Sequence, residues 1–310
     1  RLTVGKKVVH LARKKPEGVW RFVEPAGWGD VELSVPPDNQ RREDKIQFLA
    51  YLLNSLLSIE VPAAKDFLPQ QRDLTALGLD PGDPDVLRVD IERDDAIGTE
   101  TLWISRRVAK DQRDKVYVRY EGDPVVAQVN GERPRLLWNF VQDPSDLRDT
   151  TLARLRRDRV DAIDVVKDGR TFELRKIGAG WKVFDGDTGH DADARDIEVL
   201  LVEISRPRAV RGFPPVNAKE AELGFDKPGV ELRVWEDGIA EEKTDPKVKP
   251  RVKLLPTARL VFAKPPEGAA TAYVRRFTGP DHADAIMPRD LYERAARGRL
   301  EYLRASLKGF

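Results

Sequence analysis

The sequence predicts an α+β fold made of two tandem copies, each a mostly antiparallel sheet with packed helices. The first observation is an internal repeat: Phe67 to Asp80 reads FLPQQRDLTALGLD, and Phe213 to Asp226 reads FPPVNAKEAELGFD, with a constant offset of 213 − 67 = 146. The second is that strand-like and helix-like segments do not strictly alternate, which favours antiparallel pairing over a doubly wound parallel sheet. A period of this length is that of a domain, so we expect one core in each of residues 1–155 and 156–310.

Each copy is expected to open with a β-hairpin followed by an amphipathic helix. The hairpin strands, in which apolar and polar residues alternate around a turn, are Val8–Ala12 with Val19–Val23 in copy one and Thr171–Lys176 with Trp181–Phe184 in copy two. Apolar residues then recur at helical spacing over Ile46–Leu57 and over Ile197–Ile204. Asp193 is placed to cap the second of these helices.

A repeated turn element follows each helix. It consists of Leu77, Gly78, Leu79 and Asp80 in copy one and of Leu223, Gly224, Phe225 and Asp226 in copy two. The glycine permits a positive φ, the apolar neighbours can be buried, and the aspartate can cap the next turn, so a structural role is favoured over a ligand-binding role.

Short strands and a terminal helix complete the copies. The expected strands are Val86–Ile91, Thr101–Ser105 and Val116–Tyr120 in copy one, and Val230–Trp235, Ala258–Ala263 and Thr271–Phe277 in copy two. The run Arg289–Leu307 has the spacing of a helix. Four tryptophans, Trp20, Trp103, Trp181 and Trp235, fall in strand patterns and are expected in the cores.

The copies differ by two insertions, Ala26–Arg42 in the first and Asp237–Pro256 in the second. Insertions in repeats fall in loops, where recognition tends to evolve. Trp28 lies between glycines in the first insertion, and it either folds back onto its own core or anchors a partner. We therefore expect the insertions to be contact regions.

Composition excludes several classes of site. The chain has 310 residues, a net charge of +1 and no cysteine, so neither nucleic acid nor an anionic membrane is expected as a general partner, and thiolate chemistry is excluded. The most apolar run, Phe48–Leu57, is too short to span a membrane. Because the chain begins at Arg1 within a strand-like pattern, we expect an upstream segment such as a signal, an anchor or another domain.

No catalytic constellation is evident, so a non-enzymatic role is expected, without a cofactor. The three histidines lie in separate contexts, and no phosphate-binding loop or nucleophile elbow is present. A hydrolase that uses paired carboxylates stays open, because the chain carries 53 acidic residues and chance pairs are common.

One aspartate-rich string resembles a calcium loop. It contains Asp185, Asp187, Asp191, Asp193 and Asp196 at alternating spacing, but its glycine is one position early and no glutamate closes it. The favoured alternative is a strand-to-helix turn in which Asp193 is the cap. A weaker metal candidate is the pair His282 and Asp284.

Arginines mark two further candidates. Arg154, Arg156, Arg157 and Arg159 form a basic cluster at the junction of the copies, which is interpreted as a solvated linker face, with an acidic partner as the alternative and nucleic acid as a lesser one. Arg148, in the string DLRD, is expected to brace the fold as a buried cation between carboxylates.

The string from Leu74 to Pro81, together with YVRYEGDPVVAQV (Tyr117 to Val129) and DPSDLRD (Asp143 to Asp149), resembles the bacterial domain-of-unknown-function family 4340. The resemblance implies a membrane-anchored bacterial protein found beside gliding-type ABC transporter components. On this basis we expect an extracytoplasmic accessory or scaffold protein that contacts a membrane complex. A polysaccharide- or peptide-binding module is the second hypothesis.

Overall fold

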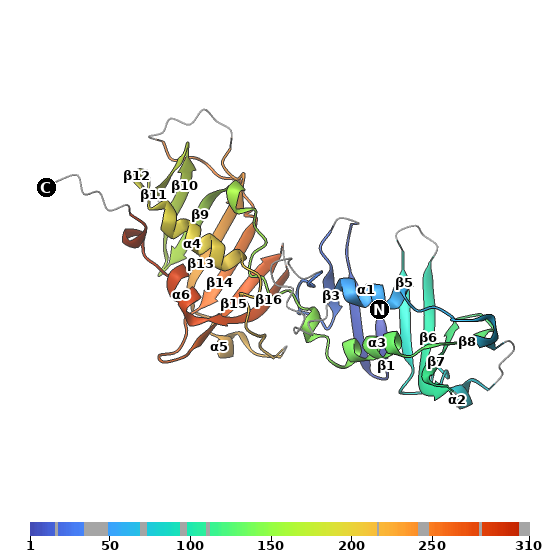
Figure 1. The fold of residues 1–310 in the computed structure, drawn as a ribbon. Helices are drawn as coiled ribbons and strands as arrows, with labels where there is room; N and C mark the ends of the chain where they lie inside the picture. The colour runs from blue at the N-terminus through green and yellow to red at the C-terminus, as the bar shows by residue number, and fades with distance from the viewer. Residues whose placement is uncertain are drawn as a thin grey trace. The chain divides into compact units, whose positions relative to one another are not determined.

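The chain forms two compact units, Arg1–Asp149 and Thr150–Phe310 (Figure 1). The computed structural model describes residues 1–303 except 16–17, 34–48, 69–72, 94–97, 110–111, 216, 241–247 and 279–280. The division falls a few residues before the one drawn from the sequence. Leu152 and Ala153 belong with unit 2 because both are buried in its core, and the Ala153 N–H donates to the Ile204 carbonyl.

Unit 1 contains one eight-stranded sheet in the order β3-β2-β1-β5-β6-β7-β8-β4. All of its pairings are antiparallel. The strands are β1 (Leu2–Val4), β2 (Lys7–Ala12), β3 (Arg21–Glu24), β4 (Phe67–Leu68), β5 (Leu87–Glu92), β6 (Thr99–Ala109), β7 (Gln112–Tyr120) and β8 (Val126–Asn130). The helices are α1 (Leu49–Leu57), α2 (Leu74–Leu77) and α3 (Glu132–Gln142), with 3-10 turns η2 (Ala64–Asp66) and η3 (Ser145–Leu147).

Unit 2 also contains one eight-stranded antiparallel sheet, in the order β12-β11-β10-β9-β13-β14-β15-β16. Its strands are β9 (Val160–Lys167), β10 (Arg170–Ile177), β11 (Gly180–Asp185), β12 (Thr188–Asp191), β13 (Pro228–Glu236), β14 (Ala258–Ala263), β15 (Thr271–Thr278) and β16 (Asp281–Pro288). The helices are α4 (Ala194–Ser205), α5 (Glu220–Leu223) and α6 (Arg289–Ala295), with 3-10 turns η4 (Arg157–Arg159) and η5 (Arg299–Tyr302).

The two sheets share the order of seven of their eight strands. In each, an antiparallel meander is followed by a helix, and a later strand, β5 or β13, then pairs with the first strand of the meander and is followed by three further antiparallel strands. The remaining strand differs, because β12 extends the meander of unit 2 whereas β4 pairs with β8 at the far edge of the unit 1 sheet. Strands β1, β5, β6, β7 and β8 therefore correspond to β9, β13, β14, β15 and β16. The predicted α+β class, with two antiparallel sheet units, is confirmed.

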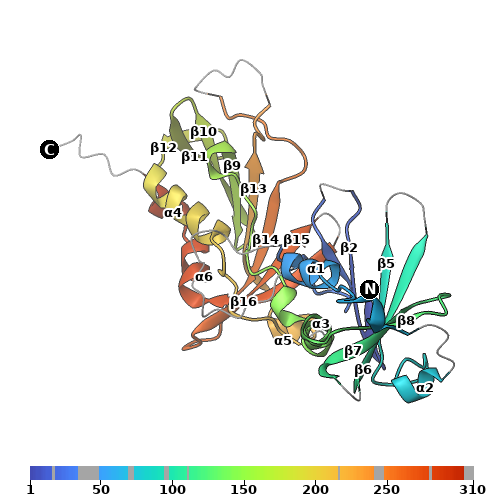
Figure 2. The same cartoon turned by 45° about the vertical axis from the view of Figure 1, so that its right-hand side comes forward.

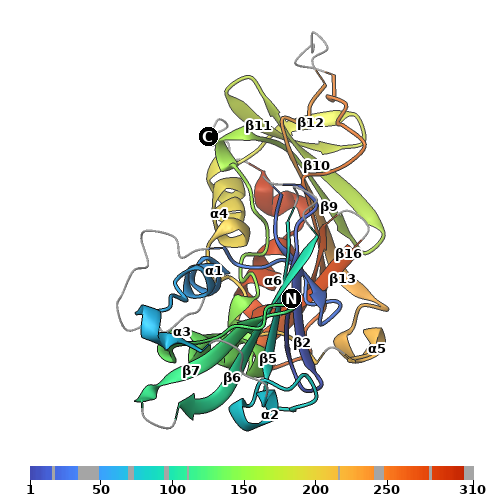
Figure 3. The same cartoon turned by 90° about the vertical axis from the view of Figure 1, so that its right-hand side faces the viewer.

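The main core of each unit lies between one face of its sheet and the longer helices (Figure 2). In unit 2 the helix α4 contributes Ile197, Leu200, Leu201 and Ile204, all fully buried. A smaller cluster lies on the other sheet face under the short helix α2 or α5, and α5 is seen across the strands from α4 in Figure 3. Among the described residues, no helix has the length and apolar composition that membrane crossing needs.

The repeated turn element has the same conformation in both units. Gly78 ends α2 and Gly224 ends α5, with φ of 67° and 77°, the left-handed values that favour glycine. Leu79 and Phe225, which follow, are buried in the smaller clusters. These contacts give the element a packing role in each unit.

The remaining residues of the turn element differ in burial between the units. Leu223 is buried, whereas Leu77 is half-buried. The Asp80 carboxylate accepts the Gly82 N–H at 2.7 Å, while Asp226 is exposed. The aspartate therefore caps the following turn in unit 1.

The predicted C-terminal helix Arg289–Leu307 is wrong in its length. The α6 helix ends at Ala295, and Gly298 is extended with φ −82° and ψ 169° before η5 begins. Tyr302 is thereby buried in the core and Leu303 bridges to Ala192, which a continuous helix would prevent. Leu307 lies outside the described residues, as does Ile46 at the predicted start of α1.

Candidate functional site

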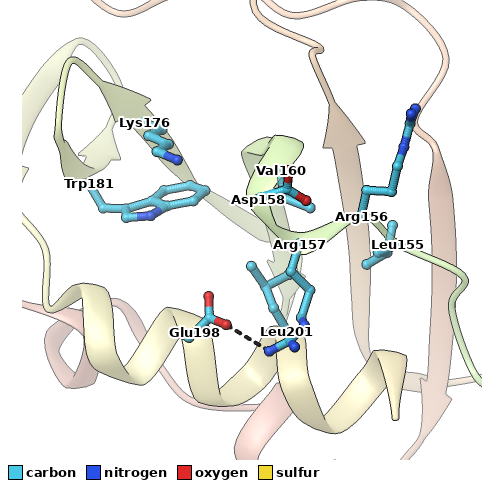
Figure 4. A pocket seen from close by; sticks show the side chains of 9 residues that line it. All are labelled: Leu155, Arg156, Arg157, Asp158, Val160, Lys176, Trp181, Glu198 and Leu201. Carbon is cyan, nitrogen blue, oxygen red and sulfur yellow. Dashed lines mark hydrogen bonds and ion pairs between the residues drawn. The ribbon is translucent and has the colours of Figure 1, made fainter. Parts of the chain in front are cut away.

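Unit 2 carries a groove of about 510 Å³ between η4, the β10–β11 hairpin and α4 (Figure 4). Its lining combines apolar side chains with charges of both signs. The lining residues are Leu155, Arg156, Arg157, Asp158, Val160, Lys176, Trp181, Glu198 and Leu201.

Trp181 provides the aromatic surface of this groove. The Gly178 turn, with φ 61°, reverses the chain so that Trp181 in β11 pairs with Lys176 in β10. Trp181 is half-buried and packs on the main core, and its carbonyl accepts the Ala192 N–H at 2.9 Å. The expectation that all four strand tryptophans are core residues therefore holds for Trp103 and Trp235, which are buried, but Trp181 and Trp20 are only half-buried.

The basic cluster is largely neutralised by carboxylates of unit 2. Arg157 Nη1 lies 2.8 Å from Glu198 Oε1, an ion pair that spans the groove in Figure 4. Arg156 donates its backbone N–H and its Nε to Glu236, at 2.6 and 3.2 Å. Two of the predicted contact residues thus line the groove in fixed orientations.

The other two arginines of the cluster lie outside the groove lining. Arg159 forms an ion pair with Asp237, and Arg154 is exposed. Because Arg156, Arg157 and Arg159 meet carboxylates of unit 2, the cluster does not form the continuous positive face that nucleic acid needs.

A buried ionic network lies on the sheet face opposite the main core. Arg175 is 2% exposed; its Nη2 is 2.6 Å from Asp164 Oδ1 and 3.4 Å from Glu173 Oε2. Burial raises the pKa of Asp164, and the Arg175 cation opposes that rise. Because adjacent residues of a strand point to opposite faces, Arg175 points away from Lys176 and the groove. This carboxylate pair has its charge satisfied by a shared arginine, which favours bracing over hydrolysis.

The aspartate-rich string forms the β11–β12 hairpin and the start of α4. Asp185 pairs with Arg299 at 3.0 Å, Asp191 lies 3.6 Å from Lys182, and Asp187 is fully exposed. Beyond the hairpin, Asp193 caps α4 by accepting the Arg195 N–H at 2.8 Å, and Asp196 pairs with Arg297 at 2.8 Å. Asp185, Asp191 and Asp196 therefore pair with three different cations, and Asp193 binds the backbone of α4.

Residues with metal-ligand side chains do not converge elsewhere in the described part of the chain. A group of three or more histidine, cysteine or acidic side chains with ligand geometry is not found there. Asp284, the weaker candidate, is held by Arg275 at 2.8 Å, and His282 stacks beside Phe277 with ring centroids 5.8 Å apart.

Trp28 folds back onto the core of unit 1, the first of the two alternatives for it, and is half-buried there. Its ring lies 5.2 Å from that of Phe22, and the Arg148 guanidinium lies 4.9 Å from its centroid. Arg148 is 5% exposed and donates its Nε to the Trp28 carbonyl at 3.2 Å. Arg148 thus braces the first insertion, as a buried cation over an aromatic ring. The rest of that insertion, residues 34–42, lies outside the described residues.

The second insertion presents exposed leucines on a fixed base. Leu254 and Leu255 are 93% and 79% exposed. Immediately before them, the Lys253 carbonyl accepts the Trp235 indole N–H at 2.9 Å, and the Lys253 N–H donates to the Gly238 carbonyl at 2.9 Å. The sequence singled out the insertion as a whole but not this leucine pair; the adjacent LL beside a proline was its only signal.

The base of the insertion is also held from its other side. The Asp161 carboxylate accepts the N–H groups of Gly238 and Ile239 at 2.8 and 2.9 Å. Residues 241–247, which carry charges of both signs, lie outside the described residues. The leucine pair therefore follows a backbone segment that is hydrogen-bonded to the sheet.

Comparisons with known proteins give one match. A family model described as Domain of unknown function (DUF4340) matches residues 42–228, from the segment before α1 in unit 1 to the first residue of β13 in unit 2. No curated protein and no solved structure matches the chain. The matched region covers more than half of the sequence, and the chain belongs to the DUF4340 family.

Proposed function

We propose that this chain is a non-enzymatic, extracytoplasmic accessory or scaffold protein of an ABC-transporter-type membrane complex, and that it acts through protein contacts. The two units are proposed to be tandem copies of one domain, because their sheets share the order of seven strands and their turn elements share conformation. The compartment and the transporter association follow from the family resemblance.

The observation that carries the proposal is the leucine pair of the second insertion. Two adjacent leucines almost fully exposed to water are costly to solubility, and such apolar positions commonly mark contact sites. Leu254 and Leu255 meet this condition on a backbone held by Trp235 and Asp161. A preorganised loop loses less conformational entropy on binding, which favours its use as a contact.

Substitution of both leucines tests the proposal. Burying a leucine side chain contributes about 1.5–3 kcal/mol, so Leu254→Ser with Leu255→Ser is expected to weaken binding by roughly 3 kcal/mol or more, about a hundredfold in affinity. Leu300→Ser is the matched control, because Leu300 is also a leucine of unit 2 and is 70% exposed. The thermal unfolding of all three proteins is expected to be alike.

The measurement is cross-linking in native cells followed by affinity capture and quantitative mass spectrometry. Membrane proteins recovered with the wild type and with Leu300→Ser should be lost from the double variant. Equal recovery by all three proteins would contradict the loop assignment. Recovery of no membrane protein by the wild type would instead favour a free-standing binding module.

The groove beside Trp181 favours that second candidate, a peptide- or polysaccharide-binding module. An exposed aromatic face between fixed charges is suited to a flat or extended ligand, since the ring supplies apolar contact and the flanking groups supply orientation. If the chain is a binding module, Trp181→Ala should abolish binding of the peptide or polysaccharide. If the chain is a scaffold, Trp181→Ala should leave the capture of membrane proteins through the leucine pair unchanged.

A further inference from the structure

Corresponding arginines of the two sheets have different surroundings. The string Tyr-Val-Arg occurs in β7 (Tyr117 to Arg119) and in β15 (Tyr273 to Arg275). In unit 2, Arg275 donates Nε and Nη2 to Asp284 at 2.8 and 3.0 Å and Nη1 to Glu220 at 2.5 Å. Two carboxylates therefore saturate this guanidinium.

In unit 1, apolar residues occupy the positions of both carboxylates. Arg275 pairs with Asp284 across β15 and β16; in β7 and β8, where Val118 pairs with Ala127, the same register places Val126 opposite Arg119. Glu220 is the first residue of α5, and the first residue of α2 is Leu74. Arg119 thus keeps its place in the sheet without either counter-charge.

A third substitution makes this face of unit 1 more apolar. In unit 2, Glu231 precedes Leu232 and pairs with Arg259 at 2.8 Å. In unit 1, Val86 precedes Leu87 and so takes the place of Glu231. Trp103 takes the place of Arg259, because Trp103 pairs with Arg88 in β5. In unit 2, Arg259 pairs with Arg233 in β13. An ion pair of unit 2 is therefore an apolar pair in unit 1, and Val86 and Trp103 are both buried in its smaller cluster.

Two adjacent donors remain without acceptors there. Trp103 and Arg119 are directly paired across β6 and β7, so their side chains leave the same face at neighbouring positions. Arg119 Nε and Trp103 Nε1 are both buried and lack hydrogen-bond partners. In the described part of the chain Arg119 forms no ion pair, and it is half-buried, so part of the residue is exposed to solvent.

We propose that Arg119, with the indole N–H of Trp103 beside it, is a binding site for a carboxylate group supplied by an acidic side chain of another polypeptide. Unit 2 contains the filled version of the same arrangement, in which side-chain carboxylates occupy the arginine. Guanidinium and carboxylate match as a bidentate, charge-assisted pair. The apolar surroundings strengthen that pair by excluding water, and a single negative charge is desolvated at less cost than a phosphate dianion.

The test is a titration of the full chain labelled with ¹⁵N-arginine, following the Nε–Hε signals. The Arg119 signal is identified by its loss in Arg119→Lys. Probes are sodium propionate, the peptide acetyl-Gly-Glu-Gly-amide, its Gln counterpart, and sodium chloride at matched ionic strength. Arg275 is the internal control, because its nitrogens are already occupied.

The expected result is a saturable shift of the Arg119 signal with propionate and the Glu peptide, no such shift with the Gln peptide or chloride, and no change at Arg275. The variant Leu74→Glu restores the carboxylate found at Glu220 and should weaken probe binding by roughly tenfold or more. Tighter binding of the Glu peptide than of propionate identifies a protein side chain as the source.

Three outcomes would overturn the proposal. They are equal shifts with chloride and propionate, no shift at Arg119, and propionate binding as tight as that of the Glu peptide. The first two exclude a carboxylate site, and the third excludes a polypeptide as its source. Because the probes are titrated into the wild-type protein, these outcomes depend on a variant only for the assignment of the Arg119 signal.

Discussion

Replacing Arg175 by methionine is expected to destabilise unit 2 strongly. Arg175 has a side chain 3% exposed and binds Asp164, which is 12% exposed, at 2.6 Å. It also donates Nη1 to the carbonyls of Ile163 and Leu174 at 3.1 and 3.0 Å. Methionine fills much of the same volume but leaves the Asp164 carboxylate without its cation.

The magnitude follows from that unpaired charge. Removing one partner of a buried ion pair costs about 3–5 kcal/mol, since the remaining charge stays desolvated. For a unit of this size the melting temperature falls by about 2–4 °C per kcal/mol, so a fall of roughly 6–20 °C is expected. Arg88→Met in unit 1 is the matched control: its pair with Asp90 is as short, at 2.8 Å, but Arg88 is 42% exposed, so its loss should cost about 1 kcal/mol or less.

Calorimetry at pH 5 and pH 8 measures both effects. Burial already raises the pKa of Asp164, and loss of Arg175 removes the main opposing influence. The folded state then holds the proton more tightly than the unfolded state, so Arg175→Met should regain stability as pH falls through the raised pKa. Equal stability loss in the two variants, or a loss from Arg175→Met that does not shrink at pH 5, would refute the reasoning.

Two further predictions concern the turn element and the aspartate-rich string. Gly78→Ala should destabilise more than Gly224→Ala: both incur the left-handed cost of about 1–2 kcal/mol, but a Cβ at Gly78 meets Arg107 and Ser105 at 2.9 Å, whereas at Gly224 its nearest contact is 3.4 Å. Denaturant melts compare them, and equal losses would be inconsistent with the crowding. Asp193→Ala should lower the free energy of unfolding by about 0.5–2 kcal/mol through loss of the α4 cap. The double variant Asp187→Asn with Asp191→Asn should have the same melting temperature as the wild type, both in calcium and in chelator. If calcium raises the melting temperature of the wild type and the double variant abolishes that rise, the string is a calcium site.

The repeat and the alternating patterns predicted the fold class because both depend on local sequence. Gly78 and Gly224 share a position that needs a positive φ, and the α4 residues from Ile197 to Ile204 share one apolar stripe. Helix α3 carried the same kind of signal, with Leu137, Phe140 and Val141 at helical spacing. Neither α3 nor the strands β1, β8, β9 and β16 were predicted from the sequence.

The candidate sites depend on contacts between residues far apart in the chain, which the sequence alone does not predict. The glycines around Trp28 left open whether it folds back or anchors a partner, because its surroundings are set by Arg148, far along the chain. No feature of the sequence distinguishes Arg119 from the other arginines of the chain. The strand register distinguishes it, because Val126 lies opposite Arg119 where Asp284 lies opposite Arg275 in unit 2.

The shared strand order has a consequence for the newborn chain. In each sheet the first strand lies in the interior, with the meander on one side and a later strand on the other: β1 pairs with β5, and β9 pairs with β13. During synthesis the meander emerges first, and the open edge of β1 or β9 has no neighbour until a helix, a turn element and the later strand have followed. Such an edge is a template for wrong pairing. Because β1 and β9 hold the same place in their sheets, each open edge is a substitute partner for strands of the other unit. Folding of one unit before the next emerges therefore protects the chain from exchanging strands.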